Sequence, residues 1–415
     1  MTILEQMGQK AKEAARALAV AGAKKDAALL KMADAIEAHE AEILAANEKD
    51  LQAARESGMR KSMLDRLALT SARIAGMAQG VREVAAQEDP IGQVVSGFVR
   101  PNGLQIQRVR VPLGVIGIIY EARPNVTADA AALCLKAGNA VILRGGKEAI
   151  HSNTAVAEAM RQAVEEAGLP ADCIQLVQDT TRASSIEMMG LTDYLDVLIP
   201  RGGAGLIRSV VENSHVPVIQ TGVGNCHVYV DASADIDMAA NIVFNAKTSR
   251  PSVCNAMETL LVHQDIAEQA LPAIKARLDE KQVELRGCER TRAILGDCVV
   301  PAEEEDWGRE YLDYILAVKV VDSFEDALAH IAAYSSGHSE AIITNDYANA
   351  RAFTERVDAA AVYVNASTRF TDGGEFGCGA EIGISTQKLH ARGPMGLREI
   401  TSYKYLVIGS GQARP

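Results

Sequence analysis

One cysteine, Cys254, is the residue best placed for covalent chemistry. It closes the polar stretch Lys247-Thr-Ser-Arg-Pro-Ser-Val-Cys254, and the apolar run Glu258-Thr-Leu-Leu-Val262 follows it. Proline and serine are helix-start residues, so the sequence predicts that Cys254 lies in the first turn of a helix. Unpaired backbone N–H groups and the positive dipole end there favour the reactive thiolate. The alternative is a small thiol buried in the core, which is the commoner use of cysteine.

A basic turn after an apolar strand is the second candidate for chemistry. Arg144-Gly-Gly-Lys147 follows the run Ala140-Val-Ile-Leu143. Two cations at the carboxyl end of a strand suit a bound phosphate, whereas the alternative is a solvated loop with ordinary surface charges. A Walker loop would need Gly and Ser or Thr where Val141 and Glu148 stand. The turn therefore favours binding of a phosphate-bearing ligand rather than phosphoryl transfer.

Several other catalytic signatures are missing. The clusters Gly202-Gly-Ala-Gly205 and Gly222-Val-Gly224 lack the spacing of a dinucleotide-binding G-x-G-x-x-G, and neither H-E-x-x-H nor G-x-S-x-G occurs. The seven cysteines show no zinc spacing, so we expect no metal site and read them as reduced thiols in a cytosol. Neither a signal region nor a membrane-spanning apolar run is found, so we expect no membrane partner.

The net charge of the chain limits the kinds of ligand that it is expected to bind. The chain has 415 residues and a formal net charge of -12. Nucleic acid is excluded as an expected partner because phosphate contacts need basic surface. An anionic small molecule would therefore need a local basic pocket.

The elements that must position these residues alternate along the chain. Residues 3–90 read as helices, and two β-rich runs around Pro101-Asn-Gly103 predict a hairpin. From residue 113 to 219 strands and helices alternate, with a last strand predicted at 216–219, and the alternation resumes from residue 227. The late strand Tyr403–Ile408 could pair with the hairpin. The pattern predicts two α/β units and a small β element.

Motifs along essentially the whole chain resemble the aldehyde dehydrogenase superfamily. The stretches that carry this resemblance, in order, are Val111-Pro-Leu-Gly-Val-Ile-Gly117, Gly138-Asn-Ala-Val-Ile-Leu143, the Cys254 region and Val362-Tyr-Val-Asn365. Further stretches resemble one branch, the glutamate-5-semialdehyde dehydrogenases: Tyr120-Glu-Ala-Arg-Pro-Asn125, Val321–Glu340, and Gly379-Ala-Glu-Ile-Gly-Ile-Ser385 with Arg392-Gly-Pro394.

The resemblance implies an aldehyde-dehydrogenase-like α/β fold with two doubly wound domains and a small β oligomerisation element. An NADP-binding domain would span residues 1–226, with the hairpin 92–111 projecting as part of the oligomerisation element. A catalytic domain would span 227–366. Residues 367–415 would form a return segment and the C-terminal oligomerisation strand, so a homo-oligomer is expected.

The resemblance also assigns roles to single residues. Cys254 falls at the nucleophile, and Asn125 is the implied oxyanion donor. The implied cofactor ligands are Arg144 near the adenosine ribose, Lys147 near the 2′-position, Gly222, and Glu310 near the nicotinamide ribose. Two cations in place of an acid at the ribose favour NADP over NAD.

One departure from the superfamily bears on the reaction. Ordinary members carry a water-activating glutamate just before the glycine pair, whereas this chain has Val218-Ile-Gln-Thr-Gly-Val-Gly224. Without a general base, hydrolysis of a thioester should be slow. The resemblance and this departure together imply NADPH-dependent reduction of γ-glutamyl 5-phosphate to glutamate-5-semialdehyde and phosphate through a cysteine thioester, in proline biosynthesis.

The ligands of the substrate's anionic groups are less defined. Arg123, Lys247 and Arg250 could hold phosphate or the α-carboxylate, and each could equally be a surface ion pair. His330 and His338 are interpreted as structural or cofactor-side residues. Alternatives to the main hypothesis are a CoA-acylating aldehyde dehydrogenase and a non-catalytic oligomeric scaffold of the same fold. A glutamate kinase is a further expected partner, because it would make the labile acyl phosphate.

Overall fold

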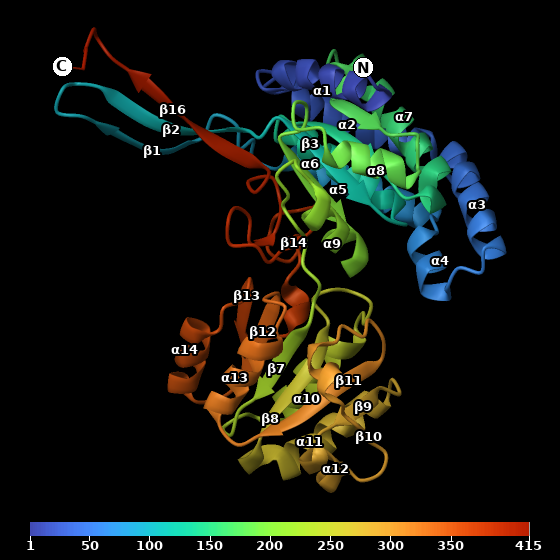
Figure 1. The fold of residues 1–415 in the computed structure, drawn as a ribbon, viewed down its shortest axis with the longest axis vertical. Coiled ribbons are helices and arrows are strands. Elements are labelled where there is room, and N and C mark those ends of the chain that lie inside the picture. Colours follow the sequence, from blue (N-terminus) through green and yellow to red (C-terminus); the bar gives the residue numbers. More distant parts are fainter. Residues whose placement is uncertain (415) are drawn as a thin grey trace. The chain divides into compact units, whose positions relative to one another are not determined.

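The computed structural model describes residues 1–414, apart from the side chains of residues 61 and 62, and the chain divides into two α/β units (Figure 1). The first unit comprises residues 1–221, 377–383 and 395–415, and the second comprises 222–376 and 384–394. The chain first passes from one unit to the other between residues 221 and 222, and its C-terminal part contributes residues to both units. The domain bounds expected from the sequence, 1–226, 227–366 and 367–415, stay a prediction.

The first unit wraps a four-stranded parallel sheet, of order β5-β4-β3-β6, in helices, and an N-terminal run of five helices begins it, as predicted. Helix α1 begins at a capping box, in which Thr2 and Glu5 bond reciprocally to each other's backbone. The elements of this body are α1 (Ile3–Leu18), α2 (Lys24–Ala38), α3 (Glu40–Glu56), α4 (Lys61–Leu67), α5 (Ser71–Ala86), β3 (Val115–Tyr120), α6 (Pro124–Lys136), β4 (Ala140–Arg144), η1 (Lys147–Ala149), α7 (Ile150–Glu166), η2 (Ala171–Cys173), β5 (Ile174–Leu176), α8 (Arg182–Met189), β6 (Val197–Arg201) and α9 (Ala204–Asn213).

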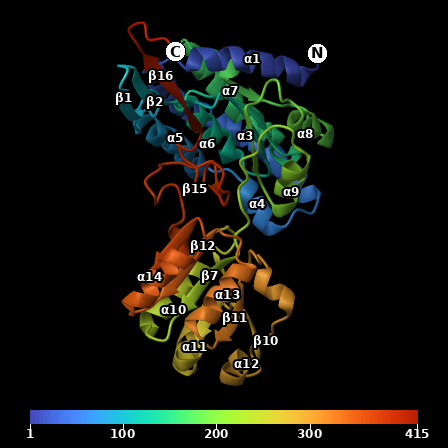
Figure 2. The same cartoon turned by 60° about the vertical axis from the view of Figure 1, so that its left-hand side comes forward.

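A separate antiparallel sheet extends from this unit (Figures 1 and 2). Strands β1 (Val94–Val99) and β2 (Gln105–Pro112) form the predicted hairpin, and Gly103 takes the positive φ of 87° that its turn needs. Strand β16 (Thr401–Ile408) pairs with β2 along its whole length, which confirms the expected pairing of the late strand with the hairpin. All of β1 is exposed.

The second unit is built on a seven-stranded parallel sheet of order β10-β9-β11-β8-β7-β12-β13. The central strands β7 and β8 are almost wholly buried, as expected for a sheet covered on both faces. The elements are β7 (Cys226–Val230), α10 (Ile236–Thr248), β8 (Met257–His263), α11 (Gln264–Asp279), β9 (Glu284–Gly287), α12 (Glu289–Leu295), β10 (Val300–Pro301), η3 (Glu304–Gly308), β11 (Ile315–Val321), α13 (Phe324–Tyr334), β12 (Ser339–Ile343), α14 (Tyr347–Arg356), β13 (Ala361–Val364), η4 (Thr368–Phe370), β14 (Ile384–Ser385) and β15 (Gly393–Pro394).

Two local predictions are wrong. Cys254 does not begin a helix: it lies in a turn, and β8 starts at Met257. The run after the cysteine is apolar and pairs with β7 and β11 on its two sides, so sheet pairing overrides the helix-start signal. The strand expected at 216–219 is reduced to one bridge between Leu198 and Val218.

Candidate active site

The turn between α10 and β8 carries Cys254, and a glycine sets its position. The cysteine is half-buried. A Cβ added to Gly224 would lie 1.5 Å from the Cys254 carbonyl oxygen, a distance that no side chain tolerates. The same glycine donates its N–H to Glu310 Oε1 at 2.8 Å. Gly224 therefore lets two segments meet: the cysteine turn and the loop that carries the predicted cofactor ligand Glu310.

A second cysteine, Cys226, contacts the backbone of the cysteine turn. Cys226 Sγ donates to the Cys254 carbonyl oxygen at 3.2 Å, and the Cys226 side chain is fully buried. Burial raises the pKa of the Cys226 thiol well above its ordinary value. Cys226 therefore stays protonated, and Cys254 is the one of these two cysteines with access to solvent.

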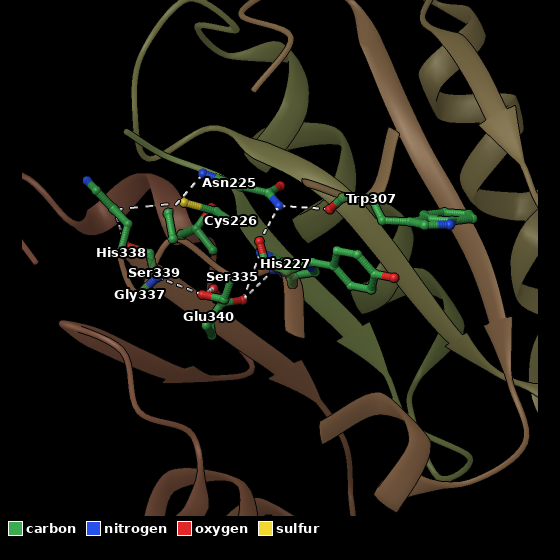
Figure 3. Close-up of polar contacts among 12 residues, drawn as sticks. Asn225, Cys226, His227, Trp307, Ser335, Gly337, His338, Ser339 and Glu340 are labelled. Carbon is green, nitrogen blue, oxygen red and sulfur yellow. Dashed lines mark hydrogen bonds and ion pairs between the residues drawn. The ribbon is translucent and has the colours of Figure 1, made fainter. Parts of the chain in front are cut away.

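A buried polar cluster ties β7 and the residue before it to η3, to the end of α13 and to β12 (Figure 3). The Asn225 amide donates to the carbonyl oxygens of Trp307 and Tyr334, each at 2.8 Å. His227 Nδ1 lies 3.0 Å from Glu340 Oε2, and both side chains are completely buried. Hydrogen bonds between distant parts of the chain thus fix the strand that leads out of Gly224.

Two histidines in this region, His330 and His338, are buried among other side chains. Burial, reinforced by the charges of His227 and Lys319, lowers the pKa of His330 to about 3, so its ring is neutral at physiological pH. His338 is completely buried, and its Nδ1 lies 2.8 Å from Ser339 Oγ and 3.8 Å from Cys226 Sγ. Both rings are thus enclosed by protein groups, and the sequence prediction of a structural or cofactor-side role stays a prediction.

The residues that follow β13 brace the cysteine turn. Asn255 Nδ2 donates to the Thr371 carbonyl at 2.9 Å, and Thr368 Oγ1 donates to the Asn255 carbonyl at 2.8 Å. The Arg369 guanidinium donates to Ser249 Oγ at 2.9 Å and also to Asn255 Oδ1. Sequence reasoning missed Arg369. In the sequence, Arg369 is a lone cation just before the glycine-rich stretch. No local pattern relates it to a cysteine 115 positions away (369 − 254).

A buried ion pair supports the other end of the turn. Lys247 Nζ lies 2.5 Å from Glu258 Oε2, with both side chains fully buried, and Glu258 Oε1 accepts the Leu312 N–H at 3.1 Å. Burial raises the pKa of Glu258 to about 7 and lowers that of Lys247, and each partner opposes the shift of the other. The charge of Lys247 is therefore paired with a buried carboxylate, whereas Arg250 on the turn is exposed to solvent.

The basic turn of the first unit is held differently. Arg144 Nη2 donates to the carbonyls of Thr180 and Thr181 at 2.7 and 2.8 Å, so the guanidinium is half-buried and fixed. Burial lowers its pKa, and the charges of Glu148 and Asp179 oppose that effect. Lys147 is exposed.

An acid stands beside these two cations, but it has a partner of its own. Glu148 accepts the Ala122 N–H through Oε1 at 2.7 Å. The exposed ammonium of Lys147 and the fixed guanidinium of Arg144 are thus the groups of this turn that could hold an anionic group of a ligand.

The other predicted site residues divide between the units. Asn125, exposed near the start of α6, donates to Asp129 Oδ2 at 3.0 Å, and Arg123 precedes that helix; both belong to the first unit. Gly222 belongs to the second unit, where its N–H donates to the Ile384 carbonyl at 3.1 Å. A Cβ at Gly222 would lie 2.6 Å from Thr386. Within the second unit, Arg250 and Cys254 lie on one turn, and Gly224 contacts both the Cys254 carbonyl and Glu310.

In this two-unit α/β protein, a glycine positions a cysteine between a helix and a buried parallel strand. That arrangement is typical of an aldehyde dehydrogenase, and the chain belongs to that family. The model of the aldehyde dehydrogenase family matches residues 3–292 and 299–406.

More specific relatives match the full length of the chain. It is 63% identical over 412 residues to the gamma-glutamyl phosphate reductase of Moorella thermoacetica, covering 99% of this chain and 98% of that protein. It is 61% identical to the enzyme of the same name from Heliobacterium modesticaldum, with 99% of each covered. The crystal structure of gamma-glutamyl phosphate reductase from Thermotoga maritima is 51% identical, with a TM-score of 0.97 and all of both chains covered.

Within residues 1–414, no helix combines the length and apolar character needed to span a bilayer. The same residues contain no cluster of three or more histidine, cysteine or acidic side chains that could hold a metal ion.

Proposed function

We propose that this protein reduces γ-glutamyl 5-phosphate to glutamate-5-semialdehyde and inorganic phosphate, with NADPH, as a step of proline biosynthesis. Full-length relatives that are about 60% identical to this chain are named gamma-glutamyl phosphate reductase. The position of Cys254 is the observation that supports the thioester chemistry. The thiol is half-buried in a turn that Gly224 positions, and the segment 218–224, which ends at that glycine, contains no carboxylate to activate water. A thioester formed here is therefore protected from hydrolysis.

The thiolate of Cys254 attacks the acyl carbon, the C–S bond forms, and the bond to phosphate breaks. A nicotinamide cofactor, when bound, would supply the hydride that reduces the thioester. Glu310, whose Oε1 accepts the Gly224 N–H, would hold the cofactor's ribose, and Asn125 is the proposed donor to the oxygen on which charge develops. Collapse of the thiohemiacetal releases the aldehyde and returns the thiolate.

NADP rather than NAD is the proposed cofactor because of the turn after β4. Lys147 presents an exposed ammonium, and Arg144 presents a guanidinium fixed by backbone carbonyls. Charge-assisted hydrogen bonds to a 2′-phosphate are stronger than those to a neutral hydroxyl. The neighbouring carboxylate of Glu148 is bonded to the Ala122 N–H, which leaves the cations to set the preference.

The experiment that tests this function follows NADP⁺ reduction with glutamate-5-semialdehyde, in the presence of phosphate, of CoA, or of neither. Turnover should need phosphate and should disappear in Cys254→Ala. Cys298→Ala, which removes an exposed thiol elsewhere, is the matched control and should keep its activity. Turnover without phosphate would mean that water resolves the thioester, and turnover with CoA alone would indicate an acylating enzyme.

We also propose that the sheet β1-β2-β16 assembles this protein into a homo-oligomer. The sheet exposes several large apolar side chains, an unusual surface for a monomer: Val94, Val95, Phe98, Val99, Tyr405, Val407 and Ile408. Light scattering should therefore give a mass above 44.2 kDa, and Val407→Lys should lower it. A monomeric mass for the unsubstituted protein would rule this assembly out.

A further inference from the structure

The guanidinium of Arg369 connects the two ends of the turn that carries Cys254. Its Nε donates to the hydroxyl of Ser249, the residue that follows α10, at 2.9 Å. Its Nη1 donates to the side-chain oxygen of Asn255, the residue that follows the cysteine. The thiol therefore lies on a short loop whose flanking residues are both bonded to one cation.

The backbone that carries this cation is itself fixed. Arg369 lies in the short 3₁₀ turn η4, where Ser367 Oγ accepts the Arg369 N–H at 3.3 Å. The buried side chain of Thr368 donates to the Asn255 carbonyl at 2.8 Å, and Asn255 Nδ2 donates back to the Arg369 carbonyl at 3.2 Å. A guanidinium held in this way is already oriented before a ligand arrives, so little entropy is lost on binding.

The charge of Arg369 is not neutralised by an ion pair. Lys388 and Arg392 in the same unit both pair with Asp358, whereas no described carboxylate lies within 4.0 Å of the Arg369 nitrogens. Burial lowers the pKa of Arg369; Asp372 and Cys254 oppose this shift, and Arg250 adds to it. The guanidinium nevertheless remains charged, because an arginine side chain does not lose its proton in proteins. The cysteine turn thus has a half-buried cation within electrostatic range of its thiol.

We propose that Arg369 binds the phosphate group of the acyl phosphate at the Cys254 turn. The proposal rests on the function proposed above and adds a ligand for the leaving group. In the forward direction the C–S bond forms, the C–O bond to phosphate breaks, and the guanidinium takes up the negative charge of the departing phosphate. In the reverse direction a phosphate oxygen attacks the thioester carbon, and the thiolate leaves.

Phosphate suits this position better than the substrate's α-carboxylate. In the tetrahedral intermediate, sulfur and the phosphate ester oxygen are bonded to the same carbon, so the phosphate must lie beside the thiol. The α-carboxylate is separated from that carbon by the rest of the glutamyl side chain. A planar guanidinium also matches two phosphate oxygens, which a lysine ammonium does not.

The test measures protection of Cys254 from alkylation by iodoacetamide, read by mass spectrometry of the peptide that contains it. Inorganic phosphate is the probe, L-glutamate is the carboxylate comparison, and no cofactor or turnover is needed. Wild type and Arg351→Met, which removes an exposed arginine of α14, should be protected equally by phosphate. Arg369→Met should need about tenfold more phosphate, as expected for the loss of a charge-assisted contact.

Each outcome decides the proposal. Unchanged phosphate protection in a folded Arg369→Met, or lost protection by L-glutamate instead of phosphate, overturns it. Should Arg369→Met fail to fold, Arg369→Lys decides: weaker phosphate protection supports the proposal, and equal protection overturns it. In the oxidative reaction, the KM for phosphate should rise while that for the aldehyde stays constant. Phosphate protection that depends on Arg369 in a protein without aldehyde turnover would refute the proposed function and leave this anion site standing.

Discussion

Two turns carry the proposed chemistry, and they are held in different ways. The cysteine turn of the second unit is positioned by backbone: Gly224 touches the Cys254 carbonyl, and buried side chains brace both ends. The basic turn of the first unit ends in an exposed lysine, and only Arg144 is tied down. A reacting atom must be placed to within a fraction of an ångström, whereas a charge acts over a longer range. The first turn should therefore be intolerant of substitution, and the second should be adjustable.

The sharpest way to break this comparison is Gly224→Ala. The added methyl group would overlap the Cys254 carbonyl and displace the turn or Glu310. We expect kcat/KM to fall by about 10²-fold or more, because a 1 Å misplacement costs that much. Gly205→Ala, where nothing lies within 4 Å of the new atom, is the control and should be fully active. An active Gly224→Ala would show that the turn is not held through its backbone.

The buried pair beneath the turn gives the next largest effect. Lys247→Met leaves the Glu258 carboxylate buried without its partner, and we expect about 3–5 kcal/mol lower free energy of unfolding in urea denaturation. Lys275→Met, which removes an exposed pair with Asp279, should cost at most about 0.5 kcal/mol. Equal losses for the two variants would contradict the distinction between buried and exposed supports.

The same pair should make stability depend on pH. The pKa of Glu258 rises to about 7 on folding, so the folded protein binds more protons than the unfolded chain between that pH and the ordinary value near 4.5. The free energy of unfolding should therefore decrease as pH rises through this window, by about 1.4 kcal/mol per pH unit at most. Glu258→Gln should flatten the profile, and an unchanged slope would assign the dependence to other groups.

The smallest effect on catalysis is expected from a substitution in the basic turn of the first unit. Lys147→Glu should raise the KM for NADP⁺ by about tenfold, which corresponds to one charge-assisted contact, and should improve the use of NAD⁺. The kcat at saturating cofactor should change little, because the turn carries no reacting atom. Lys49→Glu is the matched charge reversal on an exposed position of the same unit. A large decrease of kcat in Lys147→Glu would contradict the proposed difference between the two turns.

The parts of this molecule that the sequence predicts are those with local signals. The N-terminal helices, the hairpin at Pro101-Asn-Gly103 and its pairing with the late strand follow from periodicity and turn residues, and the structure confirms them. The helix expected at Cys254 is wrong because the apolar run after it pairs with β7 and β11, an influence no local pattern contains. Sheet pairing is decided by distant neighbours.

The missed residues have the same explanation. Gly224 was set aside because its spacing fits no dinucleotide motif, yet its use is to admit the carbonyl of a residue 30 positions later (254 − 224). Arg369 looks like any surface cation until the fold places it against Ser249 and Asn255. Close backbone approach and a cation bonded across a turn are properties of the folded chain, and composition or spacing does not record them.

The division of the chain between the units has a consequence for how the protein is made. The second unit is nearly continuous in sequence, whereas the first needs residues 395–415 to be complete. On the ribosome, β2 must wait for β16, which is synthesised almost 300 residues later (401 − 112 = 289). Throughout that interval the hairpin presents an open edge and exposed valines, a surface that invites wrong pairing with other nascent chains. Biosynthesis of this protein should accordingly depend on chaperones until its last strand emerges.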